Sequence, residues 1–331
     1  MKKLVLFYFA VIIVCVLSVG IFFLKNSGYS DHFDTKAGIG SGYDGELPLY
    51  KLSGAADKYA VIKYNESINS EQFAGQSYAA LLIDNTDNKA IVAHNAFKRI
   101  YPASTTKLMT AVVVCDAVEK GQISYDDKVY IDHDIVLGNP DAVASMLTVD
   151  CTITVRNLLF GMLMESYNDY AMILAEYVGG DVEGFAKLMN AKAEEIGATG
   201  THFVNPHGLH HENHYTTAYD MYLIINEAAK YDIIREIDKY DSFTYTYLDS
   251  DGVEQEDNIS PTNMFLAGGY SLPSNITIKE WKTGTTLRAG SVLTMIADID
   301  GKEYTMFIAD SEGPEDLYSK YTIMFNITKD D

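Results

Sequence analysis

The chain has 331 residues, 47% of them hydrophobic, which is enough for one large domain or two modest ones with a sizeable core. It carries 46 acidic against 25 basic residues, for a formal net charge of -21 at pH 7. A nucleic-acid partner is excluded, because such binding needs clustered Lys and Arg to displace counterions and the sequence has no such run.

The amino terminus predicts a membrane anchor. Lys2 and Lys3 precede an uncharged run of 21 residues, from Leu4 to Leu24, which would rise about 31 Å as a helix. The run ends in bulky residues and lacks a small-residue cleavage site, which favours an uncleaved anchor over a signal peptide. The two lysines are expected on the cytoplasmic side, which leaves the remainder of the chain outside.

Residues 25–75 are predicted to form an extracytoplasmic tether, with a flexible glycine-rich stretch at 38–42. Its later part, at 59–62, is expected to add an edge strand. The folded domain is then predicted to occupy residues 76–331.

The order of patterns in this domain predicts an α+β fold. Strand patterns at both ends bracket a helical middle, and a helix is expected to close the chain. Strands are expected at 78–83, 90–94, 276–283, 291–299 and 303–309, and helices after Pro102-Ala103 and at 154–164, 169–178, 182–196, 217–230 and 314–325. The economical arrangement is one antiparallel sheet built from both ends, flanked by helices, with an inserted all-α lobe.

Two cysteines lie outside the predicted anchor. Cys115 falls on an apolar helical face, which favours a small buried core residue, and a disulfide between Cys115 and Cys151 remains an alternative.

The segment Ser104-Thr105-Thr106-Lys107 supplies a nucleophile and a base. Ser104 is expected in the first turn of a buried helix, and Lys107, three residues on, projects from the same face. A serine hydroxyl is a poor nucleophile until a neighbouring base removes its proton, so Lys107 must be a neutral amine. Burial and a second cation would lower its pKa in this way, and Lys282 is the candidate for that cation.

Two later segments complete the chemistry. In Ser166-Tyr167-Asn168, at a loop between helices, Ser166 is predicted to relay protons and Asn168 to orient a lysine and bind a substrate amide. Lys282-Thr283-Gly284 ends a strand, where Lys282 and Thr283 would hold a carboxylate and Gly284 would let a substrate backbone lie flat. The backbone N–H groups of Ser104 and Thr285 are predicted to form an oxyanion hole.

These three segments, in this order, resemble those of the serine D-Ala-D-Ala carboxypeptidases, the low-molecular-mass penicillin-binding proteins. The likeness covers about residues 76–326 and extends to the stretches 101–111, 201–209, 214–220 and 282–290. It implies a β-lactamase/transpeptidase-like fold, a Ser104 acyl-enzyme, peptidoglycan stem peptides as substrates and β-lactams as covalent inhibitors. It also implies a bacterial cell membrane as the location, and no cofactor.

Two departures keep alternatives open. Tyr167 stands where that family usually has a small residue, and residues 310–316 contain no Arg where many members place one for the terminal carboxylate. Arg288 is the substitute candidate. A DD-endopeptidase on cross-linked peptidoglycan and a non-catalytic penicillin-binding sensor or scaffold therefore remain alternatives. A β-lactamase is disfavoured, because no Glu-x-x-Leu-Asn pattern follows Ser166.

The histidines favour structural roles. His207, His210, His211 and His214 invite a zinc site, but Pro206 and Gly208 break the helix that such spacing requires. Asp132-His133-Asp134 is expected to be an exposed turn.

Overall fold

The computed structural model describes residues 59–64, 66–73, 78–140 and 142–330. The predicted anchor and most of the predicted tether lie outside these residues. Within the described part, none of the helices has both the length and the apolar character that crossing a membrane requires.

A five-stranded antiparallel sheet joins the two ends of the domain, as the sequence predicted. Its order is β2 (Lys89–His94), β1 (Ala79–Asp84), β9 (Lys302–Ser311), β8 (Gly290–Ile299) and β7 (Ile276–Thr286). The strand β7, which carries Lys282, therefore lies at an edge of the sheet.

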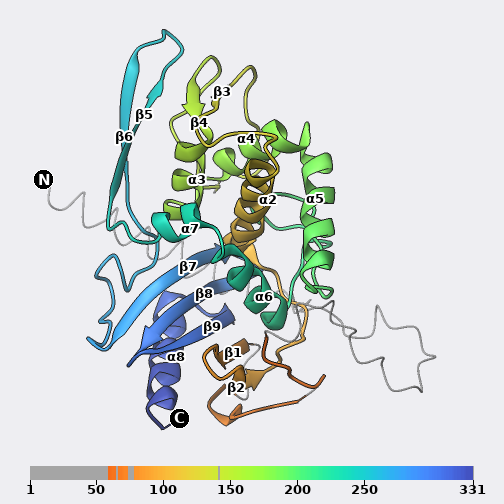
Figure 1. Ribbon diagram of the computed structural model, residues 1–331, viewed down its shortest axis with the longest axis vertical. Coiled ribbons are helices and arrows are strands. Elements are labelled where there is room, and N and C mark those ends of the chain that lie inside the picture. Colours follow the sequence, from red (N-terminus) through yellow and green to blue (C-terminus); the bar gives the residue numbers. More distant parts are fainter. Residues whose placement is uncertain (1–58, 65, 74–77, 141, 331) are drawn as a thin grey trace, which may run out of the picture. The chain divides into compact units, whose positions relative to one another are not determined.

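Both faces of this sheet are buried. Side chains in a strand point alternately to its two faces, and in β1 Leu81 and Ile83 join one core while Ala80 and Leu82 join the other. Helix α6 (Ala218–Ala228) packs against the first face and α8 (Pro314–Ile327) against the second (Figure 1). This double burial explains why β1 is apolar from Ala79 to Ile83.

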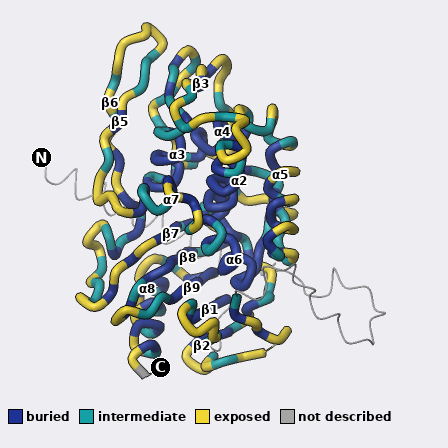
Figure 2. Tube along the Cα trace, viewed as in Figure 1, coloured by how far each residue is buried: buried dark blue, intermediate teal, exposed yellow. Residues whose placement is uncertain are grey.

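The helical lobe surrounds one buried helix. Helix α2 (Lys107–Glu119) follows the short 3-10 turn η3 (Ala103–Thr106) and packs among α3 (Val155–Met164), α4 (Asn168–Gly179) and α5 (Val182–Glu195). Figure 2 shows α2 buried along most of its length.

Side-chain caps fix the starts of two other helices where the sequence predicted them. Thr154 accepts a hydrogen bond from the Asn157 N–H at 3.2 Å, and Thr217 accepts one from the Asp220 N–H at 3.0 Å.

A second sheet was not predicted. Its four antiparallel strands are, in order, β3 (Lys128–Tyr130), β4 (Thr152–Thr154), β5 (Phe243–Leu248) and β6 (Glu254–Ile259). Of the residues in β6, only Ile259 is buried, so this strand has the polar composition of a loop. The short helix α7 (Asp232–Ile237) was also missed, and short 3-10 turns occur at η2 (Glu71–Phe73) and η4 (Thr328–Asp330).

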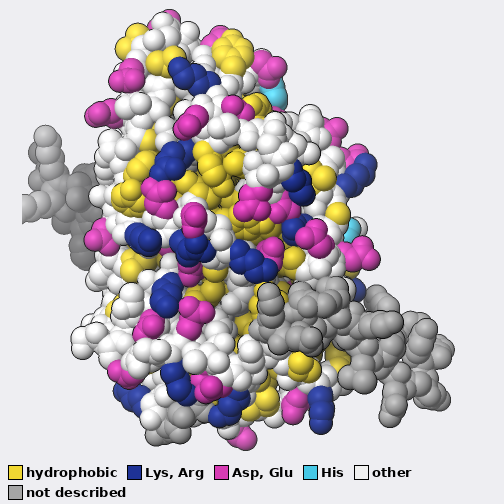
Figure 3. Space-filling model, in the orientation of Figure 1, with side chains coloured by type: hydrophobic (Ala, Val, Ile, Leu, Met, Phe, Trp, Pro, Cys, Tyr) yellow, Lys and Arg dark blue, Asp and Glu magenta, His cyan; other side chains and the backbone are white. Residues whose placement is uncertain are grey.

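Residues 59–62 do not form the expected edge strand. They pack as an irregular segment: the Ala60 N–H donates to the Tyr222 hydroxyl at 3.1 Å, and the Tyr219 hydroxyl donates to the Ala60 carbonyl at 2.9 Å. Cys115 and Cys151 are both buried free thiols, so the disulfide alternative is wrong for this structure. On the face seen in Figure 3, basic and acidic side chains are interspersed, with no single-sign patch.

Candidate active site

Ser104 lies in η3, one turn ahead of the buried helix α2. The preceding residue, Ala103, has φ of 48°, in the left-handed region that side chains other than glycine rarely adopt. Ser104 is partly exposed, whereas Lys107 is completely buried. The Lys107 Nζ lies 3.0 Å from the Ser104 Oγ, so the predicted nucleophile and base are in hydrogen-bond contact.

The other contacts of Lys107 indicate which of its atoms faces the serine. Its Nζ donates to the Asn168 Oδ1 at 2.7 Å and to the His207 carbonyl at 2.9 Å, and both of these oxygens only accept. A neutral amine has two N–H groups and one lone pair. When both N–H groups are used in this way, the lone pair is left for the Ser104 hydroxyl, and the amine can take its proton.

Burial and electrostatics favour this neutral form. An ammonium would suit the same three contacts, but burying one without a partner costs several kcal/mol. Among the described residues, Lys107 has no carboxylate within salt-bridge distance. Burial, together with the charge of Lys282, holds the pKa of Lys107 well below its usual range, and Asp169 opposes this shift only in part.

Ser166 and Lys282 form a second hydroxyl–amine pair. Ser166 has φ of 64° at the turn before α4, and its hydroxyl accepts a hydrogen bond from the Lys282 Nζ at 3.1 Å. Lys282 also donates to the Thr283 carbonyl at 3.2 Å. Burial lowers the pKa of Lys282 to about 7, although Asp238 and Glu165 act in the opposite direction.

Gly284 brings β7 against the nucleophile. A Cβ on this residue would lie 2.8 Å from the Ser104 N and 3.0 Å from the Ala103 Cβ. The glycine was interpreted as leaving room for a substrate backbone, and the structure adds a second reason, because the start of η3 occupies the space of the missing side chain. Thr285, next on this edge strand, is exposed.

Thr283 and Tyr167 have partners that the sequence did not indicate. The Thr283 hydroxyl lies 2.6 Å from that of Thr262. The Tyr167 ring packs edge-on to Tyr170 with centroids 5.0 Å apart, and its hydroxyl donates to the Asp257 carboxylate at 3.4 Å.

Arg288 is exposed in the turn between β7 and β8, close to the start of the nucleophile segment. The His210 ring packs edge-on against Tyr101, with centroids 4.6 Å apart. Burial and then the charge of Arg288 lower the pKa of His210, and the same charge opposes the burial that raises the pKa of Tyr101.

The segment 205–209 packs against α2 and against the residue before Ser104. The Pro206 carbonyl accepts from the Thr110 hydroxyl at 2.6 Å. Gly208, at φ of 85°, approaches so closely that a Cβ would lie 1.8 Å from the Ala103 carbonyl oxygen.

The histidines of this region have structural roles. His214 uses both ring nitrogens, one on the Thr106 hydroxyl at 2.8 Å and one on the Val204 N–H at 3.1 Å, and its pKa falls to about 3 through burial. Within the described ranges, no group of three potential ligands is placed to hold a metal ion. Asp132 and His133 are exposed, as expected of a turn.

Sequence reasoning missed the groups that act through their backbone. The carbonyls of His207 and Val143 contact Lys107 and Asn168 respectively, and a carbonyl leaves no signal in residue type. Asp169 was noted only as a helix start, although it is buried beside the site.

Comparison with known proteins identifies the family. Residues 66–312 match the model of the D-alanyl-D-alanine carboxypeptidase family. The chain belongs to this family. It is 36% identical to the D-alanyl-D-alanine carboxypeptidase DacF of Bacillus subtilis (strain 168) over 181 residues, 54% of this chain and 44% of that protein. It is 29% identical to the D-alanyl-D-alanine endopeptidase of Escherichia coli (strain K12) over 268 residues, 77% of each chain. The chain spans about half the length of the carboxypeptidases it matches.

Solved structures confirm the predicted fold class. The Streptomyces K15 DD-transpeptidase superimposes with a TM-score of 0.68 at 27% identity, covering 75% of this chain and 95% of that one. Penicillin-binding protein D2 of Listeria monocytogenes, in a cefotaxime-bound form, gives a TM-score of 0.63 at 26% identity, with coverage of 75% and 95%.

The contact of Gly284 predicts the effect of adding one methyl group. In Gly284→Ala the new Cβ would meet backbone atoms of η3, which cannot rotate away, so Ser104 must shift. We expect acylation by a fluorescent penicillin to slow by roughly 100-fold, because displacements of about 1 Å at a reacting group cost that much. Gly313→Ala, where nothing lies within 4 Å, is the matched control and should acylate normally. Normal acylation of Gly284→Ala would refute this role for the glycine.

The pKa of Lys282 predicts an alkaline limb in the pH profile. Above about pH 7 Lys282 loses its proton, and with it the positive charge that is predicted to attract a ligand carboxylate. The second-order acylation constant reports the free enzyme, so it should fall as the pH rises through this range for a penicillin. The methyl ester of the same penicillin carries no carboxylate and should lack this limb. An identical limb for the acid and the ester would contradict the assignment.

Proposed function

We propose that the chain is a serine DD-peptidase that acts as a D-Ala-D-Ala carboxypeptidase on peptidoglycan stem peptides. The observation that carries the proposal is the buried Lys107 Nζ, which lies 3.0 Å from the Ser104 Oγ and donates to two oxygens that can only accept. Family membership supports the substrate class, since the B. subtilis relative is a D-alanyl-D-alanine carboxypeptidase.

The reaction follows from this arrangement. Ser104 Oγ attacks the carbonyl carbon of the D-Ala-D-Ala bond as its proton passes to Lys107. The peptide C–N bond breaks, and the proton passes from Lys107 to the leaving D-Ala amine through the Ser166 hydroxyl. This hydroxyl accepts a hydrogen bond from Lys282. Water then hydrolyses the Ser104 ester. A β-lactam follows the first half of this course, since opening of its ring leaves the same kind of ester on Ser104.

Substrate binding is assigned to β7 and the loop before α4. Asn168 keeps one amide hydrogen for a substrate carbonyl, because its Nδ2 carries two and one is donated to the Val143 carbonyl. Lys282 and Thr283 attract the carboxylate of the substrate. Gly284 follows them in β7 and precedes Thr285, whose backbone N–H faces the substrate. That N–H and the N–H of Ser104 form the oxyanion hole.

Arg288 is the proposed partner of the terminal carboxylate, because it is exposed in the β7–β8 turn near Tyr101 and His210.

Endopeptidase activity on cross-linked peptidoglycan is the second candidate. The E. coli relative that the chain matches over 77% of both lengths is an endopeptidase. A cross-linked substrate extends beyond the cleaved bond. A site that binds a terminal carboxylate only weakly would therefore favour the cross-linked substrate.

One substrate comparison decides between these activities. We expect Ser104 to be acylated by fluorescent penicillin, Ser104→Ala to stay unlabelled, and D-Ala to be released from a pentapeptide faster than a cross-linked dimer is cut. Arg288→Gln should slow pentapeptide cleavage by roughly 10-fold, the loss expected for one exposed charge-assisted contact. Faster cleavage of the dimer would favour the endopeptidase. Acylation with neither cleavage would leave a penicillin-binding sensor, and an unlabelled wild-type chain would refute the proposal.

We further propose that residues 4–24 anchor the chain in a bacterial cell membrane, with the catalytic domain at 76–331 outside. The support is the uncharged run itself, bordered by Lys2 and Lys3.

This anchor predicts the fractionation of the protein. The full chain should sediment with membranes after a high-salt wash, and a version that begins at Lys25 behind a cleavable export signal should be released into the soluble extracytoplasmic fraction. Release of the full chain by salt would contradict a spanning anchor.

A further inference from the structure

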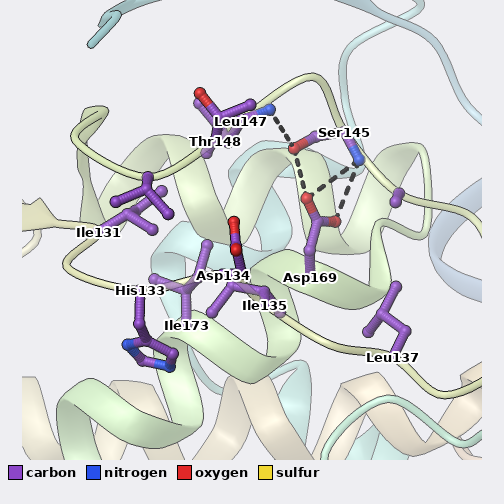
Figure 4. A pocket seen from close by; sticks show the side chains of 12 residues that line it. Ile131, His133, Asp134, Ile135, Leu137, Ser145, Leu147, Thr148, Asp169 and Ile173 are labelled. Carbon is purple, nitrogen blue, oxygen red and sulfur yellow. Dashed lines mark hydrogen bonds between the residues drawn. The ribbon is translucent and has the colours of Figure 1, made fainter.

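A long loop between β3 and β4 contacts the active site at Asn168. None of its described residues from 132 to 150 is buried. Beneath it lies a cavity of about 140 Å³, lined by loop residues such as Ile135 and Leu147 and by Asp169 and Ile173 of α4 (Figure 4). Ile135 and Leu147 are only partly buried where they pack against the core, so apolar packing alone holds the middle of this loop weakly.

Hydrogen bonds to two consecutive residues of α4 hold the loop there. The Asp169 carboxylate accepts from the Ser145 N–H, at 3.1 Å to each oxygen, and also from the Ser145 hydroxyl (Figure 4). Two residues earlier, the Val143 carbonyl accepts from the backbone N–H of Asn168 at 2.8 Å and from its Nδ2 at 2.9 Å.

The Val143 carbonyl determines which way the Asn168 amide points. A carbonyl can only accept, so it requires the Nδ2 of Asn168 and turns the Oδ1 toward Lys107. A flipped amide would present N–H groups to Lys107, and the lysine would have to accept one of them with its lone pair. That lone pair would then be lost to the Ser104 proton.

We propose that Asp169 is a positioning residue for acyl transfer: by holding Ser145 it fixes the Val143 carbonyl, which orients Asn168 and thereby the amine of Lys107. Asp169 contacts neither Ser104 nor Lys107 by a hydrogen bond, so it acts through the loop. The inference rests on the proposed acyl transfer, and it adds a residue and a loop to that site.

The charge of Asp169 has a separate, opposite effect. Three titratable groups face Lys107: Lys282 on β7, Asp169 on α4 and His207 in the segment 205–209. His207 has a pKa of about 3 through burial and the nearby Lys107, so it is neutral where the enzyme would work. Asp169 raises the pKa of Lys107, so its removal lowers that pKa further and favours the neutral amine.

The pH profile of acylation by fluorescent penicillin separates positioning from charge. Asp169→Ala removes both the hold on the loop and the charge, whereas Asp169→Asn removes the charge but keeps an oxygen for the Ser145 N–H. We expect the maximum of the second-order rate constant to fall by about 100-fold in Asp169→Ala and by less than about 10-fold in Asp169→Asn. In both variants the acidic limb should move to lower pH.

Asp134→Ala is the matched control, since this exposed carboxylate lines the same cavity. It should keep the wild-type maximum, and thermal unfolding should show that all variants are folded. If Asp169→Ala does not fold, Asp169→Leu replaces it: leucine fills the space without offering Ser145 an acceptor, and the expected loss is again about 100-fold.

An unchanged maximum in folded Asp169→Ala, or in Asp169→Leu where that variant replaces it, would overturn the inference while acylation of the wild type upheld the proposed function. An equal loss in Asp169→Ala and Asp169→Asn would also overturn it, since charge would then explain the effect. Failure of the wild type to be acylated would instead refute the proposed function.

Discussion

The chemistry of this protein depends on one amine that is kept out of water. Lys107 has no exposed surface, and two of its three polar contacts are oxygens that can only accept. Because these oxygens take both N–H groups of a neutral amine, the lone pair is directed at Ser104 by its surroundings. Burial, and below about pH 7 also the charge of Lys282, make an ammonium at Lys107 unfavourable and so maintain this state.

The fold brings four separate segments to this amine. Helix α2 supplies Lys107 from within the helical lobe, and the edge strand β7 supplies Lys282 from the sheet. The start of α4 adds Asn168, and the segment 205–209 adds a carbonyl. The backbone is left-handed at Ala103, which precedes Ser104, and at Ser166 itself. This conformation costs free energy that the surrounding packing must offset.

The sequence predicted much of this arrangement because its signals were local. The strands of the large sheet alternate or are continuously apolar, and Thr154 and Thr217 are caps whose chemistry is visible in the residue itself. The second sheet escaped because β6 buries one residue and so lacks a hydrophobic pattern. The spacing of Ser104 and Lys107 predicted their contact, since both lie within one helical turn.

The remaining parts of the site have no local signal. The carbonyls of Val143 and His207 act through backbone atoms that every residue has, and they lie 25 and 100 positions from their partners. Only the folded chain shows that Asp169 holds the β3–β4 loop through Ser145, 24 positions away in the sequence.

The protonation state of Lys107 is the most direct test of the account. In protein labelled with 13C at the lysine Cε, with the Lys107 signal assigned from a Lys107→Met variant, the account predicts that this signal is already in the neutral form at a pH where the exposed lysines are still charged. Exposed lysines should titrate at about 10.4 in the same spectra. A Lys107 that titrated together with the exposed lysines would contradict the central claim.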